Sequence, residues 1–407
     1  MSLSVGVRNA SPGKGIYMFA VFARTRKALG AFTIFASLTA LAACNVPNST
    51  GGPSINTNKP VPVALLVPSG SGSANDASLA KSLENAARLA MSELSGVTID
   101  LRVYSTAGNA NQAASMATKA VNDGAKIILG PVFAQSANAA GVAVSRRNVN
   151  VLSFSNNPSI AGGNVFILGN TFQNTANRLT RYAARQGKGK ILVVNGNDQA
   201  EAQGRAAIQA AIQNSGASLA GTTSFELSQN GIVNALPKIS AQVRSSGAQS
   251  IFLTSGTSGA LPFLAGLLPE NGVNPANIQY IGLQRWDIPA NALSLPGLQG
   301  GWFAIPDPAL SGRFSGRYQA RYGAAPHPIA GLAYDGIAAI GALVKAGKAN
   351  ALTTTALTQP QGFVGVNGIF RLRGNGTNER GLAIAQIQNG SVVIIDPAPR
   401  SFSGAGF

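Results

Sequence analysis

The chain has 407 residues, of which 45% are hydrophobic and 11% charged, and its formal net charge is +17 at pH 7. This composition excludes disorder driven by high charge and low hydrophobicity, and the length suffices for two packed lobes. The one cysteine, Cys44, and the one histidine, His327, exclude an internal disulfide and a structural zinc site of Cys and His ligands. The charge favours anionic partners, but the basic residues are scattered singly, so we expect no nucleic-acid binding.

The N-terminal segment has the features of a secretory signal in the usual order. Three basic residues in 24–27 precede an apolar run over 29–43, which is too short for a good membrane-spanning helix. The run ends in Leu-Ala-Ala-Cys, which resembles the lipobox of bacterial lipoproteins, where a signal peptidase cuts before the cysteine and its thiol is acylated. We therefore expect a signal peptide over 1–43 and lipidation of Cys44. The alternative is an ordinary signal peptide with an incidental cysteine.

Two further expectations concern the same end of the chain. Met18 is a more ordinary initiator than Met1, which would make residues 1–17 upstream sequence. Residues 44–59 are rich in Asn, Ser, Thr, Gly and Pro, a composition typical of flexible linkers. We expect this segment to be a lipidated tether, and we expect no later segment to span a membrane.

From residue 60 onward, apolar strands alternate with amphipathic helices. In chain order, the pattern predicts strands at 61–67, 97–104, 126–129 and 149–154, and helices at 79–94, 110–122 and 136–147. The alternation resumes with strands at 190–195, 219–226, 249–254 and 278–282, and helices at 199–214, 232–246 and 257–268. Continuous apolar strands separated by helices are typical of parallel sheets covered on both faces. The sequence therefore predicts an α/β protein with two doubly wound parallel-sheet lobes.

Ligands of such sheets bind beyond the carboxyl ends of the strands, so the loops that follow the strands are candidate binding loops. These loops are rich in Ser, Asn, Thr, Gln and Gly and hold few charges; they lie at 68–75, 130–136, 155–160, 196–199, 255–258 and 283–287. Neutral hydrogen-bonding groups in these loops favour ligand binding without catalysis.

Motifs of catalysis are missing from the sequence. It has no dinucleotide fingerprint, no phosphate-binding P-loop, no nucleophile elbow and no visible pair of carboxylates for acid–base work. We expect His327, within Ala-Pro-His-Pro, to lie in a loop between two helices. The sequence thus predicts no enzyme, no cofactor and no metal site, and an enzyme that uses His327 is the weakest alternative.

Several segments together resemble the type I periplasmic solute-binding proteins, in particular the leucine/isoleucine/valine-binding branch of ABC transport. The resemblance covers about residues 60–397 and rests on the segments 130–133, 149–155, 164–170, 314–323, 331–336 and 362–383. The most specific of these is Phe-Ser-Gly-Arg-Tyr-Gln-Ala-Arg-Tyr-Gly followed by Gly-Leu-Ala-Tyr-Asp-Gly. The closing segment is also similar to that of lipoproteins that activate penicillin-binding proteins.

The resemblance implies two lobes joined by a three-strand hinge, with the ligand between them. We expect the hinge crossings near residues 170, 305 and 350. One lobe would then comprise 60–170 with 306–350, the other 171–305 with 351–397, and a tail would follow at 398–407.

The resemblance also places candidate ligand-binding residues. By position, the hydroxyl groups that hold an amino-acid carboxylate fall at Ala134, beside Gln135 and Ser136, and at Asn156 or Asn157. The family's tyrosines fall near residues 200–201 and 255–257, and the acidic residue that holds the ammonium falls near Gln284. With the loops after the strands, the candidate set is Ser69, Ser71, Gln135, Ser136, Asn156, Asn157, Asp198, Ser255, Thr257, Gln284 and Arg285.

The candidate site departs from the family where an ammonium would bind. A buried ammonium needs a negative partner or several acceptors, whereas Gln284 is neutral and Arg285 would repel a cation. We therefore expect a neutral or anionic solute rather than an α-amino acid, or a vacant cleft that a partner uses.

Structural roles compete with binding for several of these residues. Arg285 and Trp286 fit a surface pair as well as a ligand contact, and Asp198 is expected to cap the helix that follows it. Asn156 and Asn157 precede a proline and could make an Asx-turn. We expect Tyr334 and Asp335 to pack or hydrogen-bond within the fold.

The predicted function is that of a lipid-anchored, periplasmic solute-binding protein of an ABC transporter. Its expected partners are a small polar solute, an ABC permease in the inner membrane, and a membrane reached through the lipid anchor. The alternative is a lipoprotein that regulates cell-wall synthesis by contact with a synthase. Both functions are implied by the resemblance. They remain alternatives because one fold can carry different functions.

Overall fold

The computed structural model describes residues 51–402. The predicted signal peptide, Cys44 and the start of the tether lie outside these residues, as does the end of the predicted tail, 403–407. Within the described part, no helix combines the length and the hydropathy needed to cross a bilayer.

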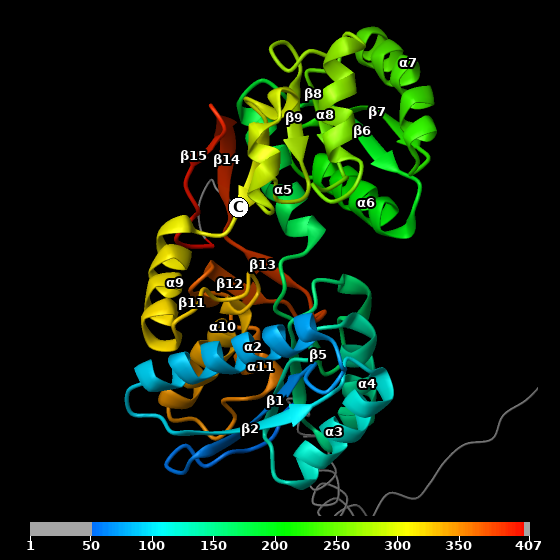
Figure 1. Ribbon diagram of the computed structural model, residues 1–407. Coiled ribbons are helices and arrows are strands. Elements are labelled where there is room, and N and C mark those ends of the chain that lie inside the picture. The colour runs from blue at the N-terminus through cyan, green and yellow to red at the C-terminus, as the bar shows by residue number, and fades with distance from the viewer. Residues whose placement is uncertain (1–50, 403–407) are drawn as a thin grey trace, which may run out of the picture. The chain divides into compact units, whose positions relative to one another are not determined.

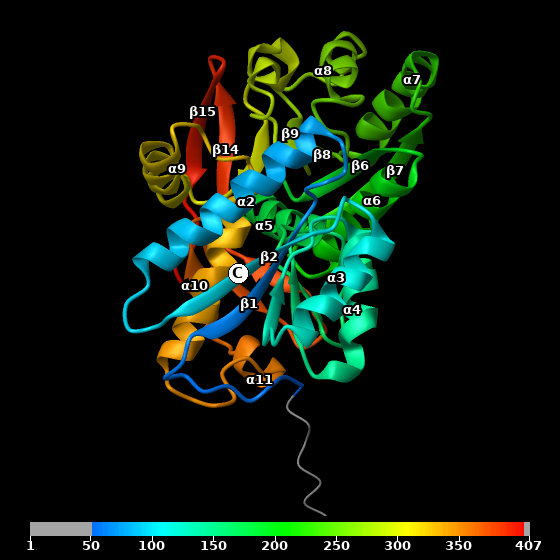
Figure 2. The ribbon, with the colours of Figure 1, turned by 60° about the horizontal axis from the view of Figure 1, so that its bottom comes forward.

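The first sheet is entirely parallel and carries helices on both faces (Figure 1). Its strand order is β2 (Ile99–Ser105), β1 (Val61–Val67), β3 (Ile127–Leu129), β4 (Asn150–Ser153) and β5 (Val165–Ile167). α2 (Ala74–Glu93) and α10 (Gly331–Lys345) cover one face, and α3 (Ala110–Asn122) and α4 (Ala134–Val144) the other (Figure 2). The predicted apolar stripe of α2 is buried, since Leu79, Leu83, Ala86, Ala87 and Ala90 all belong to the core beneath it.

The second sheet is mixed. Its parallel part contains β6 (Lys190–Gly196), β7 (Ser218–Phe225), β8 (Ser250–Leu253), β9 (Gln279–Gly282) and β10 (Trp302–Ile305). β14 (Ala383–Gln388) pairs antiparallel to β10, and β15 (Ser391–Asp396) pairs antiparallel to β14. The predicted α/β fold with two doubly wound lobes is confirmed, and a hairpin, which needs no crossover helix, adds an antiparallel edge to the second sheet.

Helices also cover both faces of the second sheet. α5 (Phe172–Arg185) and α6 (Gln199–Gln213) pack on one face, and α7 (Gln229–Ser246) and α8 (Leu261–Glu270) on the other. The predicted helices and strands of this part thus form at the predicted places, within a few residues at their ends.

The chain passes between the two sheets in three places. It leaves the first sheet after β5 and returns from β10 to α9 (Pro308–Tyr322). It then forms α11 (Thr354–Leu357) and a small antiparallel sheet of β11 (Phe363–Gly365), β12 (Gly368–Leu372) and β13 (Asn378–Arg380) before it reaches β14.

Residues 351–380 pack with the first sheet and not, as predicted, with the second. Leu352, Leu357, Phe363 and Phe370 belong to the same core cluster as the residues of β1 and α10. The expected crossing near residue 350 is therefore wrong, and the third crossing follows Arg380. The apolar side chains of this segment complete the core under α10, which explains why the chain stays with the first lobe for longer.

The end of the predicted tether is packed against the first lobe. Ile55 is buried in its core, and the Ile55 amide donates to the Ala349 carbonyl at 2.9 Å. The Gly51 carbonyl accepts from Asn150 Nδ2 at 2.7 Å and from Thr354 Oγ1 at 2.9 Å. The prediction of a free tether is therefore wrong for residues 51–59, because these contacts hold the backbone in place.

Candidate functional site

A cavity of about 280 Å³ lies between elements of the two sheets. Its apolar lining comes mainly from Phe172, Leu283, Ile288, Ile329, Leu332 and Leu382. Its polar lining comes from Asn156, Asn170, Thr175, Gln284, Arg285, Asn367 and Arg380. The lining thus combines apolar surface, neutral amides and two guanidinium groups, and it contains no Asp or Glu among the described residues.

Strand ends place the polar groups of this cavity. Asn156 follows β4, Asn170 follows β5, and Gln284 and Arg285 follow β9, all at carboxyl ends of parallel strands. The end of β9 is fixed by Trp286, whose ring is fully buried beside Gly282. A Cβ on Gly282 would lie 2.3 Å from that ring, so the close approach requires glycine. Trp286 is therefore a core residue, and the predicted surface pair with Arg285 is wrong.

Arg285 reaches the cavity with its charge already balanced by a neighbour. Its Nε donates to Asp287 Oδ1 at 2.9 Å and its Nη2 to Asp287 Oδ2 at 2.5 Å. The Arg285 side chain is 37% exposed and that of Asp287 is 15% exposed. This two-point contact fixes the plane of the guanidinium at the mouth of the cavity.

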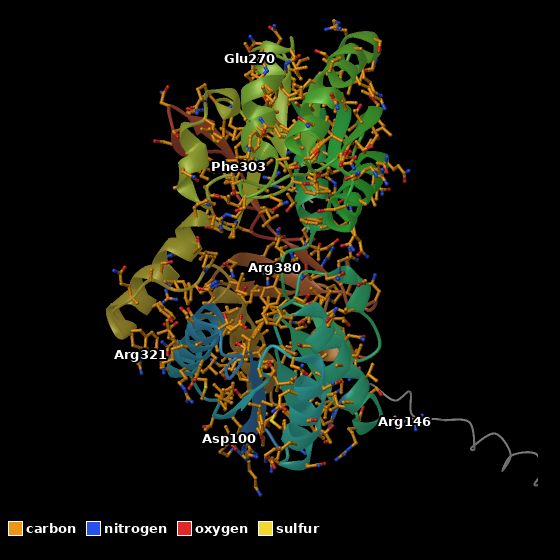
Figure 3. All side chains as sticks on the ribbon, turned by 45° about the vertical axis from the view of Figure 1, so that its right-hand side comes forward. Asp100, Arg146, Glu270, Phe303, Arg321 and Arg380 are labelled. Carbon is orange, nitrogen blue, oxygen red and sulfur yellow. The ribbon has the colours of Figure 1, made fainter. Side chains whose placement is uncertain are left out.

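Arg380 forms a buried ion pair with Asp335 of α10. Arg380 Nη1 lies 3.2 Å from Asp335 Oδ2, and Asp335 Oδ1 accepts from the Val366 amide at 2.7 Å. Arg380 Nε donates to the Leu168 carbonyl at 2.7 Å, whereas Nη2 has no partner among the described residues. Burial raises the pKa of Asp335 and lowers that of Arg380, while their mutual attraction opposes both shifts. The predicted structural role of Asp335 is confirmed by these contacts, and Figure 3 shows where Arg380 lies.

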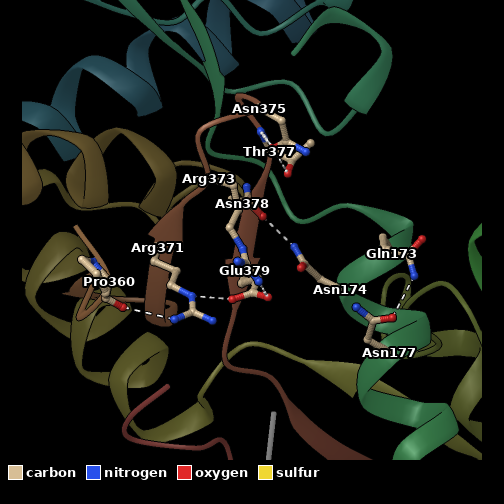
Figure 4. A network of polar contacts seen from close by, with 10 residues as sticks. All are labelled: Gln173, Asn174, Asn177, Pro360, Arg371, Arg373, Asn375, Thr377, Asn378 and Glu379. Atoms are coloured by element: carbon tan, nitrogen blue, oxygen red, sulfur yellow. Dashed lines mark hydrogen bonds and ion pairs between the residues drawn. The ribbon is translucent and has the colours of Figure 1, made fainter. Parts of the chain in front are cut away.

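A polar network ties the crossing strands together (Figure 4). Asn378 Nδ2 donates to the carbonyls of Ile167 and Gly169, at 2.7 and 2.8 Å. Asn174 Nδ2 of α5 in turn donates to Asn378 Oδ1 at 2.6 Å. One asparagine of β13 thus links the end of the first sheet to the first helix of the second.

Glu379, next to Asn378, is held by two arginines in the same network. Burial raises the pKa of Glu379, but the hydrogen bonds from Arg371 and Arg373 outweigh burial, so the pKa lies below its ordinary value. The carboxylate therefore stays ionised beside the hinge.

The structure divides the predicted binding residues between two hollows. Asn156, Gln284 and Arg285 line the cavity between the sheets. A second hollow of about 420 Å³ shares Gln284 and Arg285 with it and is also lined by Asp198 and Thr257. Both hollows therefore open at the carboxyl edge of the second sheet.

The acidic groups of the second hollow are largely engaged within the fold. Asp198 Oδ1 accepts from the Glu201 amide at 2.7 Å, which confirms that Asp198 caps α6. The Glu201 carboxylate accepts from the Gly196 amide at 2.7 Å, from Ser255 Oγ at 2.6 Å and from Thr254 Oγ1. Ser255 is therefore a structural partner of Glu201 and lines neither hollow.

The other predicted residues are not brought to the cavity. Ser69 Oγ lies 2.5 Å from Ser105 Oγ, Ser71 Oγ accepts from the Ser73 amide, and Gln135 is exposed. Ser136 is buried, and its hydroxyl has no partner among the described residues. Asn157 Oδ1 accepts from the Ser159 amide at 2.9 Å, which confirms the Asx-turn interpretation.

Four polar residues of the cavity were not predicted from the sequence: Asn170, Thr175, Asn367 and Arg380. Asn170 lies in the loop after β5, so the rule on strand ends would have found it had this loop been included, whereas Thr175 lies in the first turn of α5. Asn367 and Arg380 belong to the small antiparallel sheet, and nothing in the local sequence indicates that this sheet borders the cavity.

The described residues contain no group of three or more His, Cys, Asp or Glu side chains that could hold a metal ion. His327 lies between α9 and α10, which confirms its predicted place in a loop.

A model of the periplasmic binding protein family matches residues 60–391. The chain belongs to this family. Its members are solute-binding proteins of ABC transporters and not enzymes, and membership implies a periplasmic location. No curated protein matches the chain.

Solved structures with the same fold include transporter components of three bacteria. A putative branched-chain amino acid ABC transporter protein of Rhodospirillum rubrum has a TM-score of 0.69 at 18% identity, over 83% of this chain and all of that one. A substrate-binding protein of Desulfitobacterium hafniense in complex with Leu has a TM-score of 0.61 at 16% identity, over 83% and 100%. A solute-binding protein of Rhodopseudomonas palustris in complex with 3,4-dihydroxybenzoic acid has a TM-score of 0.56 at 16% identity, over 84% and 98%.

Proposed function

We propose that this chain is a lipid-anchored solute-binding protein of an ABC importer of the branched-chain amino acid type. It captures a small solute between its two lobes and delivers the solute to a permease. Family membership supports this assignment, and the structural neighbours that are named as branched-chain amino acid ABC transporter proteins support the transporter type. The anchor rests on the lipobox-like segment that ends at Cys44.

The solute is a small organic anion or neutral acid derivative with an apolar body. The observation that carries this proposal is the lining of the 280 Å³ cavity, which contains Arg285 and Arg380 among apolar side chains and no Asp or Glu of the described residues. The partner carboxylates of the two arginines, Asp287 and Asp335, lie outside this lining, and Arg380 Nη2 has no partner among the described residues. A buried ammonium would find no charged acceptor there, whereas a carboxylate would find guanidinium and amide donors. Two structural neighbours, one in complex with Leu and one with an aromatic acid, indicate that this fold accommodates either class.

A thermal-shift screen with matched ligands tests the proposal. Leucine, leucinamide, 4-methylpentanoate and 4-methylpentanamide share one carbon skeleton and differ in the charged groups, and benzoate and 3,4-dihydroxybenzoate extend the set. We expect a carboxylate without an ammonium to raise the melting temperature most, because binding to the folded state adds RT ln(1 + [L]/Kd) of stability. Stabilisation by leucine equal to that by 4-methylpentanoate would overturn the assigned solute class and leave the transporter role standing.

Variants locate the site of any ligand that binds. Arg285→Gln should weaken binding of the stabilising ligand tenfold or more, since it removes a charge-assisted contact at the mouth of the cavity. Arg244→Gln, on the exposed face of α7, is the matched control and should bind normally. If no ligand raises the melting temperature of the folded protein, and the protein instead captures a cell-wall synthase in a pull-down from membranes, the regulatory alternative replaces this proposal.

A further inference from the structure

Six basic side chains gather where the strands of the first sheet begin, at the edge opposite the cavity. We call this surface the basic face; it comprises Lys59, Lys126, Arg146, Arg147, Lys345 and Lys348. Lys59 and Lys126 immediately precede β1 and β3, and Arg146 and Arg147 precede β4. Lys345 ends α10, and its Nζ lies 3.1 Å from Ser95 Oγ, close to the start of β2. Figure 3 shows Arg146 and Asp100 at the end of this lobe remote from Arg380.

The acidic residues of this edge are already engaged by other bases. Glu93 pairs with Arg317 at 2.9 Å, Asp100 with Arg102 at 2.5 Å, and Asp123 with Lys119 at 2.8 Å. None of the six members of the basic face forms an ion pair with a described residue. All are exposed except the partly exposed Lys126. The edge therefore carries a concentrated positive charge without local neutralisation.

The N-terminal segment joins the body at this same face. The Gly52 carbonyl accepts from Asn148 Nδ2 at 2.7 Å, directly after Arg147, and the Ile55 amide bonds to Ala349, next to Lys348. Residues 44–50, outside the described part, number seven and span at most about 25 Å. An acyl chain on Cys44 would hold the basic face close to the bilayer surface.

We propose that the basic face binds anionic phospholipid headgroups. Beside a lipid anchor, a patch of basic residues adds electrostatic attraction to anionic headgroups and orients the body at the bilayer surface. Each Lys or Arg close to an anionic surface strengthens partitioning about fivefold. Contact through the starts of the strands leaves the cavity, which lies at their carboxyl ends, facing away from the lipid.

The test uses protein that begins at residue 45, which has no thiol to acylate and retains every described residue and core cluster. Co-sedimentation is measured with vesicles of pure phosphatidylcholine and with vesicles that contain 30% phosphatidylglycerol. We expect binding to the anionic vesicles alone, and loss of binding in 0.5 M salt because the charges are then screened.

Two triple variants with the same change in net charge distinguish the effect of the basic face on vesicle binding from the effect of net charge. Arg146→Gln/Arg147→Gln/Lys348→Gln removes half of the basic face and should weaken vesicle binding about a hundredfold. Lys190→Gln/Lys238→Gln/Arg244→Gln removes exposed bases of the second sheet and its helices and should weaken it less than threefold. Melting curves check that both variants fold.

Three results would overturn the proposal. They are equal binding to neutral and anionic vesicles, equal loss in the two triple variants, and stronger binding to a soluble polyanion such as heparin than to anionic vesicles. Because the protein used carries no lipid and the assay uses no solute, each result is independent of the proposed anchor and of the proposed transport role.

Discussion

At the scale of single residues, the ion pair of Asp335 and Arg380 is the most demanding feature of the molecule. Both side chains are almost fully buried, that of Asp335 0% and that of Arg380 3% exposed, and they join α10 to the strand at the third crossing. Desolvation of two charges costs more than an ordinary ion pair returns, so such a pair is tolerated only where hydrogen bonds complete it. The Val366 amide and the Leu168 carbonyl provide these bonds.

We predict that Asp335→Asn lowers the free energy of unfolding by about 3–5 kcal/mol, because it leaves the Arg380 charge buried without its counter-ion. Urea denaturation measures the change. Asp76→Asn, in the first turn of α2, is the control and should cost less than about 1 kcal/mol. If Asp335→Asn behaves like this control, the pair does not carry the stability assigned to it. A double variant with apolar residues at both positions should recover part of the loss.

Glu379 gives a prediction for pH. Its pKa is lowered in the folded protein, so the unfolded chain takes up a proton at higher pH than the folded one does. The stability contributed by Glu379 is therefore complete above the unfolded pKa of about 4.3 and is lost as the pH falls below it. We predict that Glu379→Gln reduces the loss of stability between pH 5 and pH 3 by up to about 1 kcal/mol. The prediction is contradicted if urea denaturation shows the same loss of unfolding free energy between pH 5 and pH 3 in Glu379→Gln as in the wild type.

At the scale of elements, the segment 51–55 acts as part of the first lobe. Its backbone carbonyls accept from Asn148, which precedes β4, from Asn150, which begins β4, and from Thr354, which begins α11. Asn150 is central to this arrangement, since its buried Nδ2 donates to the carbonyls of Gly51 and Leu352. The segment thereby joins two stretches of chain about 200 residues apart.

We predict that Asn150→Ala destabilises the protein by about 1–3 kcal/mol, because it leaves the buried Leu352 carbonyl without a donor and removes one of the donors to the Gly51 carbonyl. Thermal unfolding gives the change, and limited proteolysis should show faster cleavage near residue 51. Asn111→Ala, near the start of α3, is a control and should leave the cleavage rate unchanged. If protease cleaves the N-terminal segment of Asn150→Ala no faster than that of the wild type, Asn150 does not hold this segment.

At the scale of the whole molecule, the proposed anchor and the basic face act on the same end of the first lobe. We predict that Cys44→Ser abolishes metabolic labelling with a fatty-acid analogue and shifts most of the protein from the membrane fraction to the soluble one. Wild-type protein, processed in the same cells, is the reference. Label that persists in Cys44→Ser would rule out lipidation at this residue.

The periodicity of the local sequence predicted β1 to β4 and β6 to β9, but not β5, β10, β14 or β15. Periodicity is visible in the apolar stripe from Leu79 to Leu94 and in apolar strands such as 61–67. A helix that buries one face, or a strand that buries both faces, needs apolar residues at the buried positions, so the local sequence records the burial. The fold class follows from the order of these elements. The rule that ligands bind at carboxyl ends of strands placed Asn156, Gln284 and Arg285 correctly beside the cavity.

Only the tertiary structure decided which distant groups meet. The apolar residues of 351–380 would suit either core, and their packing under α10 assigned them to the first lobe. Arg285 is matched by Asp287, and Arg380 by a carboxylate 45 residues earlier in the chain. Sequence periodicity records that a side chain is buried but not what it is buried against. The cavity, the ion pairs and the basic face depend on those partners, and therefore the fold determined them.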